Sequence, residues 1–268
     1  MPADALPTAL LLTVPAALVM ATLVAYGWHR PPKLWGPKRD FGQNALDLAV
    51  ALSVPVTALA GALTLALQWT PLVAAAAQVL LLVALVWFLV RCSGRNRLQH
   101  AGVWPRGAYQ LPRDLRYGVL GALAALPLVM ATNAWLIVLG LLARQPAPTI
   151  GHEMLTQMQR SGGAELIALV FTAVVVAPLL EELVFRGLLQ SALLKTLGWR
   201  RRWPAVVCAS AAWAAIHGAV PWQVMPGLFV LGLILGAMVE RTGSLRGAIL
   251  AHALFNAANV ALVLAGVG

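Results

Sequence analysis

Residues 164–186 read AELIALVFTAVVVAPLLEELVFR, a mainly apolar run that ends in Glu181, Glu182 and Arg186. The run is long enough to cross a hydrocarbon core about 30 Å thick as an α-helix, which takes roughly 20 residues. A charge at the bilayer centre costs about 2.5–3.5 kcal/mol on insertion scales, so these charges must pair, face a wet cavity or lie near the interface. The stretch predicts a membrane helix with a polar, functional end.

The composition extends this prediction to the rest of the chain. Of its 268 residues, 60% are hydrophobic and 10% are charged, and the mean hydropathy is +0.81. Soluble domains carry about 25% charged residues. The chain therefore lacks the polar surface of a water-soluble globular protein, and the same composition excludes a disordered chain and a disulfide scaffold.

We predict an all-α polytopic membrane protein with about eight transmembrane helices. The N-terminal run lacks the positively charged start of a signal peptide, so we expect it to be retained as a helix. The stretch 181–199 is a candidate extension of the fifth helix along the membrane interface. The eight apolar runs lie near residues 6–27, 45–67, 71–90, 117–142, 164–185, 203–220, 224–240 and 245–265.

The basic residues predict the orientation of these helices. All Lys and Arg residues except Arg144 and Arg160 follow the first, third, fifth or seventh predicted span. By the positive-inside rule these loops face the cytoplasm, and both termini lie outside it. The net charge of +10 is thereby explained by orientation, and we expect no nucleic-acid partner, because the basic residues are scattered over separate loops. The short loops are typical of a bacterial inner-membrane protein.

The chain is predicted to divide where Arg144–Pro148 interrupts the helical pattern. This gives an N-terminal four-span region over 1–143, a linker loop over 144–163, and a second membrane domain over 164–265 whose four helices form a core. No internal repeat is evident, which weakens a secondary-transporter interpretation.

Polar residues concentrate in the second domain. Glu182 and Arg186 are spaced i, i+4 and are predicted to form an ion pair, whereas Glu181 points about 100° away around the helix. Pro178 removes a backbone donor, so the helix should kink and free a carbonyl near Val174.

Two further predicted helices add histidines. His217 follows Trp213 at i, i+4, and His252 precedes Asn256 at the same spacing, so each pair projects from one helix face. Intramembrane ionisable residues are functional candidates. A Glu, two His and an Asn suit hydrolysis of an amide by water, with a carboxylate base and donors for the oxyanion.

A zinc site is the alternative that these residue types leave open. Glu181, His217 and His252 would make a three-ligand catalytic site with an open position. The HExxH pattern of many zinc peptidases is absent, because the residues after His152 and Glu153 do not include a second histidine at the required spacing. We therefore expect no metal cofactor, with zinc as the alternative.

The ordered motifs resemble those of the CAAX prenyl protease and bacteriocin-processing (CPBP, or Abi) family of intramembrane endopeptidases. EExxxR corresponds to Glu181–Arg186, the usual FxxxH appears with tryptophan as Trp213–His217, and HxxxN corresponds to His252–Asn256. The Gly243–Ser244–Leu245 sequence before the third motif is also similar. The resemblance covers residues 164–260, and the first four spans are recognised only by their hydropathy.

The resemblance implies a role for each matched residue. Glu181 and His217 would activate water, His252 and Asn256 would form the oxyanion hole, and Glu182 and Arg186 would support them. The expected partners are membrane lipids and a peptide or protein substrate, with a lipid-modified or membrane-bound tail as one form. A non-catalytic membrane scaffold or immunity protein, and a proton-coupled transporter, remain as alternatives. One tension is that His217 is expected to lie deeper in the membrane than Glu181 and His252.

Overall fold

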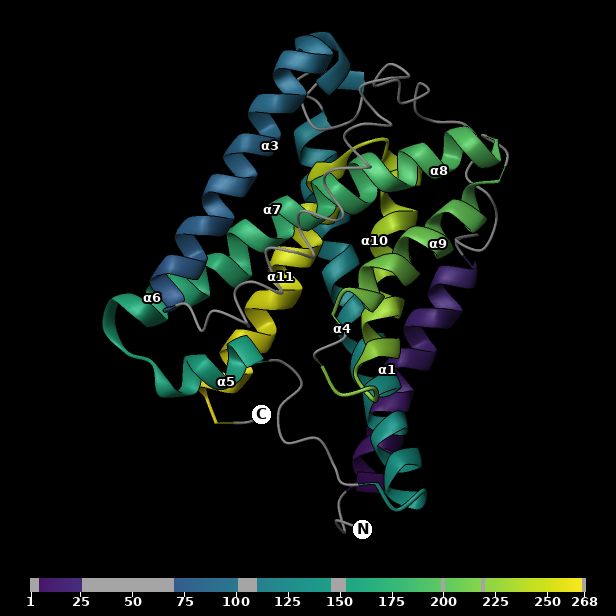
Figure 1. Cartoon of the computed structure of the whole chain (residues 1–268). Helices are drawn as coiled ribbons and strands as arrows, with labels where there is room; N and C mark the ends of the chain where they lie inside the picture. Colours follow the sequence, from purple (N-terminus) through teal and green to yellow (C-terminus); the bar gives the residue numbers. More distant parts are fainter. Residues whose placement is uncertain are drawn as a thin grey trace.

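The computed structural model describes residues 5–25, 70–100, 110–145, 153–198, 201–217 and 220–266. Every regular element in these ranges is helical, which confirms the all-α prediction (Figure 1). The separate α-helices among them are α1 (Ala5–Ala25), α3 (Pro71–His100), α4 (Gln110–Leu142), α5 (Glu153–Arg160), α9 (Arg202–Ala215), α10 (Met225–Thr242) and α11 (Leu245–Leu264). A long helix of several segments lies between α5 and α9.

Six helices in the described ranges are long and apolar enough to cross a membrane. They confirm a polytopic membrane protein, and they correspond to all but two of the predicted spans. One of the two, 45–67, lies outside the described residues. The six helices are Ala5–Ala25, Pro71–Arg91, Leu111–Leu142, Gly163–Leu197, Met225–Thr242 and Leu245–Leu264.

The predicted sixth span, 203–220, is shorter than expected. Helix α9 ends at Ala215 after 14 residues, a length of about 21 Å that does not cross the hydrocarbon core. The chain then turns, with the amide of Val220 donating to the carbonyl of His217 at 2.9 Å. Pro221 stops a further helical turn because proline has no amide hydrogen and disfavours helical geometry in the residue before it.

The long helix runs without a break from Gly163 to Leu197, so the stretch after residue 185 continues the fifth span. Its segments are α6 (Gly163–Phe171), the π-helix η1 (Thr172–Val176), α7 (Ala177–Glu181), the π-helix η2 (Glu182–Leu189) and α8 (Gln190–Leu197). The π-segment η1 lies directly before Pro178, where the predicted break in the hydrogen-bond ladder falls. The π-segment η2 begins at Glu182 and contains Arg186. The segment η2 thus contains charged residues and η1 lies one short helical segment before them, as π-bulges near functional sites often do.

The helices pack in an order that joins the N-terminal spans to the C-terminal half. Helix α4 packs against α1, α10 and α11, while α3 packs along α6 and α7. Figure 1 shows α1 and α3 on opposite sides of the molecule with α11 between them. The long helix contacts α11 through both π-segments and contacts α9 through η2 and α8. The charged end of the fifth span is therefore enclosed by helices.

Glycines allow α10 to approach its neighbours closely. A Cβ atom on Gly232 would lie 2.8 Å from Ser210 Cβ, and one on Gly236 would lie 2.8 Å from Gln190 Oε1. Both distances are shorter than real Cβ contacts. Gly232 and Gly236 therefore set the separation of α10 from α9 and α8, in the manner of small residues between membrane helices.

Candidate active site

The adjacent carboxylates Glu181 and Glu182 lie in different environments. The Glu182 side chain has 0% exposure, whereas that of Glu181 has 16%. The predicted angular separation around the helix thus places one carboxylate inside the bundle and leaves the other partly accessible. Only Glu181 of the two is placed to meet water or a substrate.

The buried carboxylate is compensated by a buried arginine. Arg186 NH1 lies 2.9 Å from Glu182 Oε1, and both side chains are fully buried. The guanidinium also lies 4.7 Å from the centroid of the Trp213 ring, in a cation–π arrangement. Its NH2 group donates to the carbonyl of Gly232 at 3.4 Å. The predicted i, i+4 ion pair is present, and its partners on α9 and α10 hold it in place.

Trp213 connects the parts of the site. Its indole Nε1 donates to Glu181 Oε2 at 2.7 Å. Its ring makes edge-on contacts with the imidazoles of His217 and His252, at centroid distances of 5.0 and 5.5 Å. The side chain is 1% exposed. From the sequence, Trp213 was expected only as the aromatic residue of the motif that ends at His217, and its role as a hydrogen-bond donor to Glu181 was not predicted.

His252 lies between the two carboxylates. Its Nδ1 is 3.0 Å from Glu182 Oε1, and its Nε2 is 3.9 Å from Glu181 Oε2. Because Glu182 Oε1 already accepts from Arg186, it acts as an acceptor for His252 as well, so Nδ1 carries a proton. The neutral ring then presents an acceptor at Nε2, and the imidazolium presents a donor there. Glu182 therefore determines which way His252 faces.

His217 enters the site through Trp213. It lies in the turn after α9 and is half-buried. Its Nδ1 donates to the carbonyl of Trp213 at 2.9 Å, since a carbonyl only accepts. In the neutral ring Nε2 is then an acceptor. The ring packs edge-on against Trp213, which also contacts Glu181 and His252. Through Trp213, His217 is therefore connected to the other two residues, although it was expected to lie deeper in the membrane than they do.

The side-chain amide of Asn256 bonds a backbone carbonyl of the long helix that receives no hydrogen bond from within that helix. The amide of Ala177 donates to the carbonyl of Thr172 in the π-register, which takes it away from its ordinary α-helical acceptor, Ala173. The next residue in the π-register is Pro178, which has no amide hydrogen. Asn256 Nδ2 donates to this Ala173 carbonyl at 2.8 Å. The freed carbonyl is thus at Ala173, one residue from the predicted position, and it orients the Asn256 amide.

The zinc alternative would require Glu181, His217 and His252 to share one ion. Over the described residues, no three His, Cys, Asp or Glu side chains gather as a metal-binding group. Of the three proposed ligands, Glu181 bonds Trp213 through Oε2 and His217 turns Nδ1 to a carbonyl. A histidine that binds a metal through Nε2 also donates from Nδ1 in this way, so treatment with a chelator is the test that separates the metal-free reaction from the zinc reaction.

A second buried polar cluster lies nearby on α8, α9 and α10. Arg202 NH1 pairs with Glu240 Oε2 at 2.6 Å, and Gln190 Nε2 donates to Glu240 Oε1 at 2.7 Å. Gln190 also donates to the carbonyl of Gly236. These contacts join three helices around the site, and none of the three side chains was singled out from the sequence.

Comparison with known proteins agrees with the motifs. Residues 163–258 match the family model of the type II CAAX prenyl endopeptidase Rce1-like proteins. The search of curated proteins and the search of solved structures each gave no match. The matched range contains Glu181, His217, His252 and Asn256. The resemblance inferred from the three motifs is confirmed for this part of the membrane protein: residues 163–258 match the model of the type II CAAX prenyl endopeptidase Rce1-like family.

Proposed function

We propose that the protein is an intramembrane endopeptidase in which Glu181 activates a water molecule for attack on a peptide bond. The observation that carries the proposal is the position of Glu181: a partly exposed carboxylate 3.9 Å from His252 Nε2 and bonded to Trp213 Nε1. A carboxylate has about four acceptor positions, so the bond from Trp213 leaves room for a water molecule. The match of residues 163–258 to the Rce1-like family model supports the reaction class, a protease.

The chemical step begins with Glu181 taking a proton from water. The water oxygen bonds to the scissile carbonyl carbon, and the carbonyl electrons move to the oxygen to form a tetrahedral oxyanion. When the C–N bond breaks, the proton held by Glu181 passes to the leaving amine. General-base catalysis of this kind contributes about 10²–10⁴-fold to the rate. His217, with its Nε2 as an acceptor, would orient the same water.

His252 and Asn256 would stabilise the oxyanion. Asn256 Nδ2 has two hydrogens, of which one is used by the Ala173 carbonyl, and the second is available to a substrate oxygen. His252 would donate from Nε2 as the imidazolium, held in orientation by Glu182. Each donor of an oxyanion hole contributes about 10²–10³ in kcat. Glu182 and Arg186 would act only by positioning.

The proposed reaction uses no metal. The support for this is that, over the described residues, no three His, Cys, Asp or Glu side chains gather as a metal-binding group. Incubation with a chelator tests the point, followed by addition of zinc. Activity that persists in the chelator supports the metal-free reaction, and activity that is lost and then restored by zinc contradicts it.

We propose a peptide or protein substrate that reaches the site from the membrane, with a lipid-modified tail as one form. The protein would reside in a bacterial inner membrane among lipids, with its termini outside the cytoplasm and the site near the cytoplasmic side. This orientation is supported by the asymmetric distribution of Lys and Arg residues along the chain. We expect neither a nucleic-acid partner nor a cofactor.

A comparison of the termini of membrane peptides in cells tests the function and identifies substrates. Cells would express the wild type, Glu181→Gln, or the matched control Glu165→Gln. Glu165 lies earlier in the same long helix, about 24 Å from Glu181 along its axis. We expect new termini with the wild type and the control and none with Glu181→Gln. Identical termini in all three strains would contradict the proposal and would favour a non-catalytic scaffold.

A further inference from the structure

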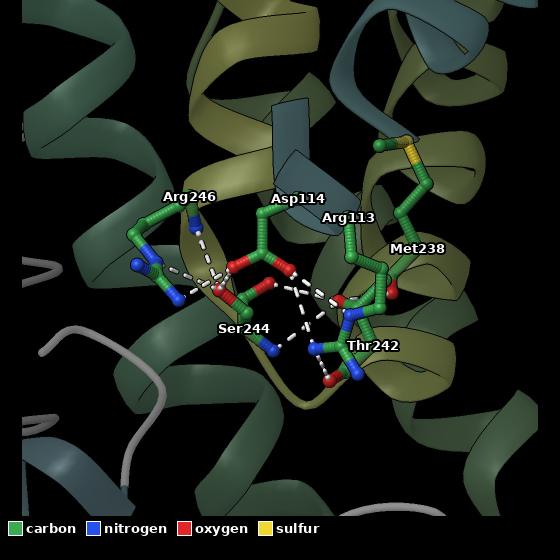
Figure 2. A network of polar contacts seen from close by, with 6 residues as sticks. All are labelled: Arg113, Asp114, Met238, Thr242, Ser244 and Arg246. Carbon is green, nitrogen blue, oxygen red and sulfur yellow. Dashed lines mark hydrogen bonds and ion pairs between the residues drawn. The ribbon is translucent and has the colours of Figure 1, made fainter. Parts of the chain in front are cut away.

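A buried aspartate outside the family region anchors the helix that carries His252 and Asn256. Asp114 lies in the first turns of α4, 1% exposed. Its Oδ2 is 2.7 Å from Arg246 NH2 and 2.8 Å from Ser244 Oγ. Its Oδ1 is 3.2 Å from Arg113 NH2. Figure 2 shows Asp114 with Arg246 on one side and Arg113 on the other, facing Ser244.

Ser244 is the N-cap of α11. Its backbone is extended, with φ −134° and ψ 137°, and its Oγ accepts from the amide of Arg246 at 3.3 Å. The same hydroxyl donates to Asp114. Asp114 therefore places a carboxylate at the positive end of the α11 dipole, where negative charge is favourable, and it does so through the residue that starts the helix.

Arg113 holds the other side of the same turn. Its NH2 group donates to the carbonyl of Thr242 at 3.0 Å, at the end of α10. Gly243, between the two anchored residues, has φ 66°, a left-handed conformation that favours glycine. Thr242 Oγ1 accepts from the amide of Ser244 at 3.2 Å. Arg113 and Asp114, which are adjacent in α4, thus hold the residues on either side of Gly243 in the turn between α10 and α11.

Close packing continues from this anchor along α11. A Cβ atom on Gly247 would lie 3.1 Å from the carbonyl oxygen of Asp114, and one on Gly121 would lie 3.2 Å from Ala251 Cβ. Ala251 precedes His252. Because α11 is a single helix from Leu245 to Leu264, its rotation and axial position at Ser244 are passed on to His252 about 12 Å away.

We propose that Asp114 is a positioning residue for the hydrolysis proposed above: by anchoring Ser244 it sets the rotation and register of α11, and thereby the alignment of His252 with Glu182 and Glu181. This inference rests on the proposed function. It also assigns the N-terminal region a part in the reaction, because α4 lies outside residues 163–258. A misplacement of about 1 Å at a catalytic group can cost about 100-fold in rate.

Four variants of the full-length protein test the proposal by kinetics. Asp114→Asn preserves shape but removes the charge, and Ser244→Ala removes the hydroxyl that joins Asp114 to α11. Ser244→Thr is the conservative variant. Ser210→Ala is the matched control, since Ser210 is equally buried and bonds only the carbonyl of Val206 in its own helix. We expect Asp114→Asn and Ser244→Ala to lower kcat about tenfold or more with KM little changed, and Ser244→Thr and Ser210→Ala to retain wild-type kcat.

An activity-independent measurement separates failure of this inference from failure of the proposed function. In protein labelled with ¹⁵N-histidine, the His252 resonances report the hydrogen bond from Nδ1 to Glu182, and the chain has 5 histidines to assign. We expect these resonances to shift in Asp114→Asn and Ser244→Ala but not in Ser210→Ala. Unchanged His252 resonances, or a wild-type kcat in folded Asp114→Asn, would overturn the inference. If the wild type cleaves no peptide but the His252 resonances still shift in Asp114→Asn, only the proposed function is overturned, and the anchoring of α11 by Asp114 stands.

Discussion

The indole Nε1 of Trp213 donates to Glu181 Oε2 at 2.7 Å, across 32 residues of sequence. This bond joins α9 to the long helix at the point where the fifth span becomes charged. The same indole ring contacts His217, His252 and the Arg186 guanidinium. Three of the side chains proposed for hydrolysis, those of Glu181, His217 and His252, therefore contact one aromatic residue.

Substitutions of Trp213 separate its packing from its hydrogen bond. Trp213→Ala should destabilise the protein by about 3–5 kcal/mol, the usual cost of removing a fully buried aromatic side chain, and should abolish cleavage. Trp213→Phe retains most of the packing and produces the FxxxH motif of the family that this chain resembles, so we expect activity within about tenfold of wild type. Thermal unfolding and peptide-cleavage kinetics measure the two effects. Equal loss in both variants would show that the indole hydrogen bond is essential.

The buried ion pair predicts a non-additive effect on stability. Arg186→Met would leave the Glu182 charge buried without its arginine, which should cost about 3–5 kcal/mol. The double variant Glu182→Gln/Arg186→Met removes both charges and should unfold at a higher temperature than Arg186→Met alone. Thermal unfolding in detergent measures both midpoints. A double variant less stable than Arg186→Met would contradict the assignment of the pair.

Asn256 can be tested against a neighbour on the same helix. Asn256→Ala removes the proposed oxyanion donor, and kcat should fall about 10²–10³-fold with KM little changed. Asn259→Ala is the control, because Asn259 Nδ2 donates only within α11, to the carbonyl of Phe255. Steady-state kinetics on both variants give the comparison. Similar kcat values for the two would place Asn256 outside the reaction.

Pro178 is predicted to act on Asn256 through the backbone. Pro178→Ala restores an amide hydrogen that competes with Asn256 for the carbonyls around Ala173, so we expect a lower kcat and a shifted Asn256 side-chain amide resonance. Pro127→Ala, inside α4, is the matched control for removing a helix proline. If both proline variants leave the Asn256 resonance in place, the Ala173 carbonyl is not held available by Pro178.

The features predicted from the sequence are those that depend on spacing within one helix. Glu182 and Arg186 form the expected pair because residues four apart share a helix face. Six of the predicted spans correspond to helices long enough to cross a membrane, because an apolar run of about 20 residues is itself the local requirement for a spanning helix. The break in the hydrogen-bond ladder near Pro178 was also predicted locally, since proline always removes an amide hydrogen.

The features that the sequence did not reveal depend on residues far apart in the chain. Asp114 and Ser244 are separated by 130 residues, so no local pattern marks the contact between them. The shift of the freed carbonyl to Ala173 needed the π-register of η1, which lengthens the ladder by one residue. The sixth span was predicted too long because the apolar sequence continues past Ala215, whereas α9 ends there and the chain turns before Pro221.

The central claim is that Glu181 is the base that activates water, and cleavage kinetics of the purified protein test it most directly. The comparison uses wild type and Glu181→Gln, with Glu165→Gln as the control, on a peptide identified from the cellular termini. We expect Glu181→Gln to lower kcat by about 10²–10⁴-fold while the variant unfolds at the same temperature as the wild type. A Glu181→Gln protein that cleaves the peptide at the wild-type rate would contradict this claim.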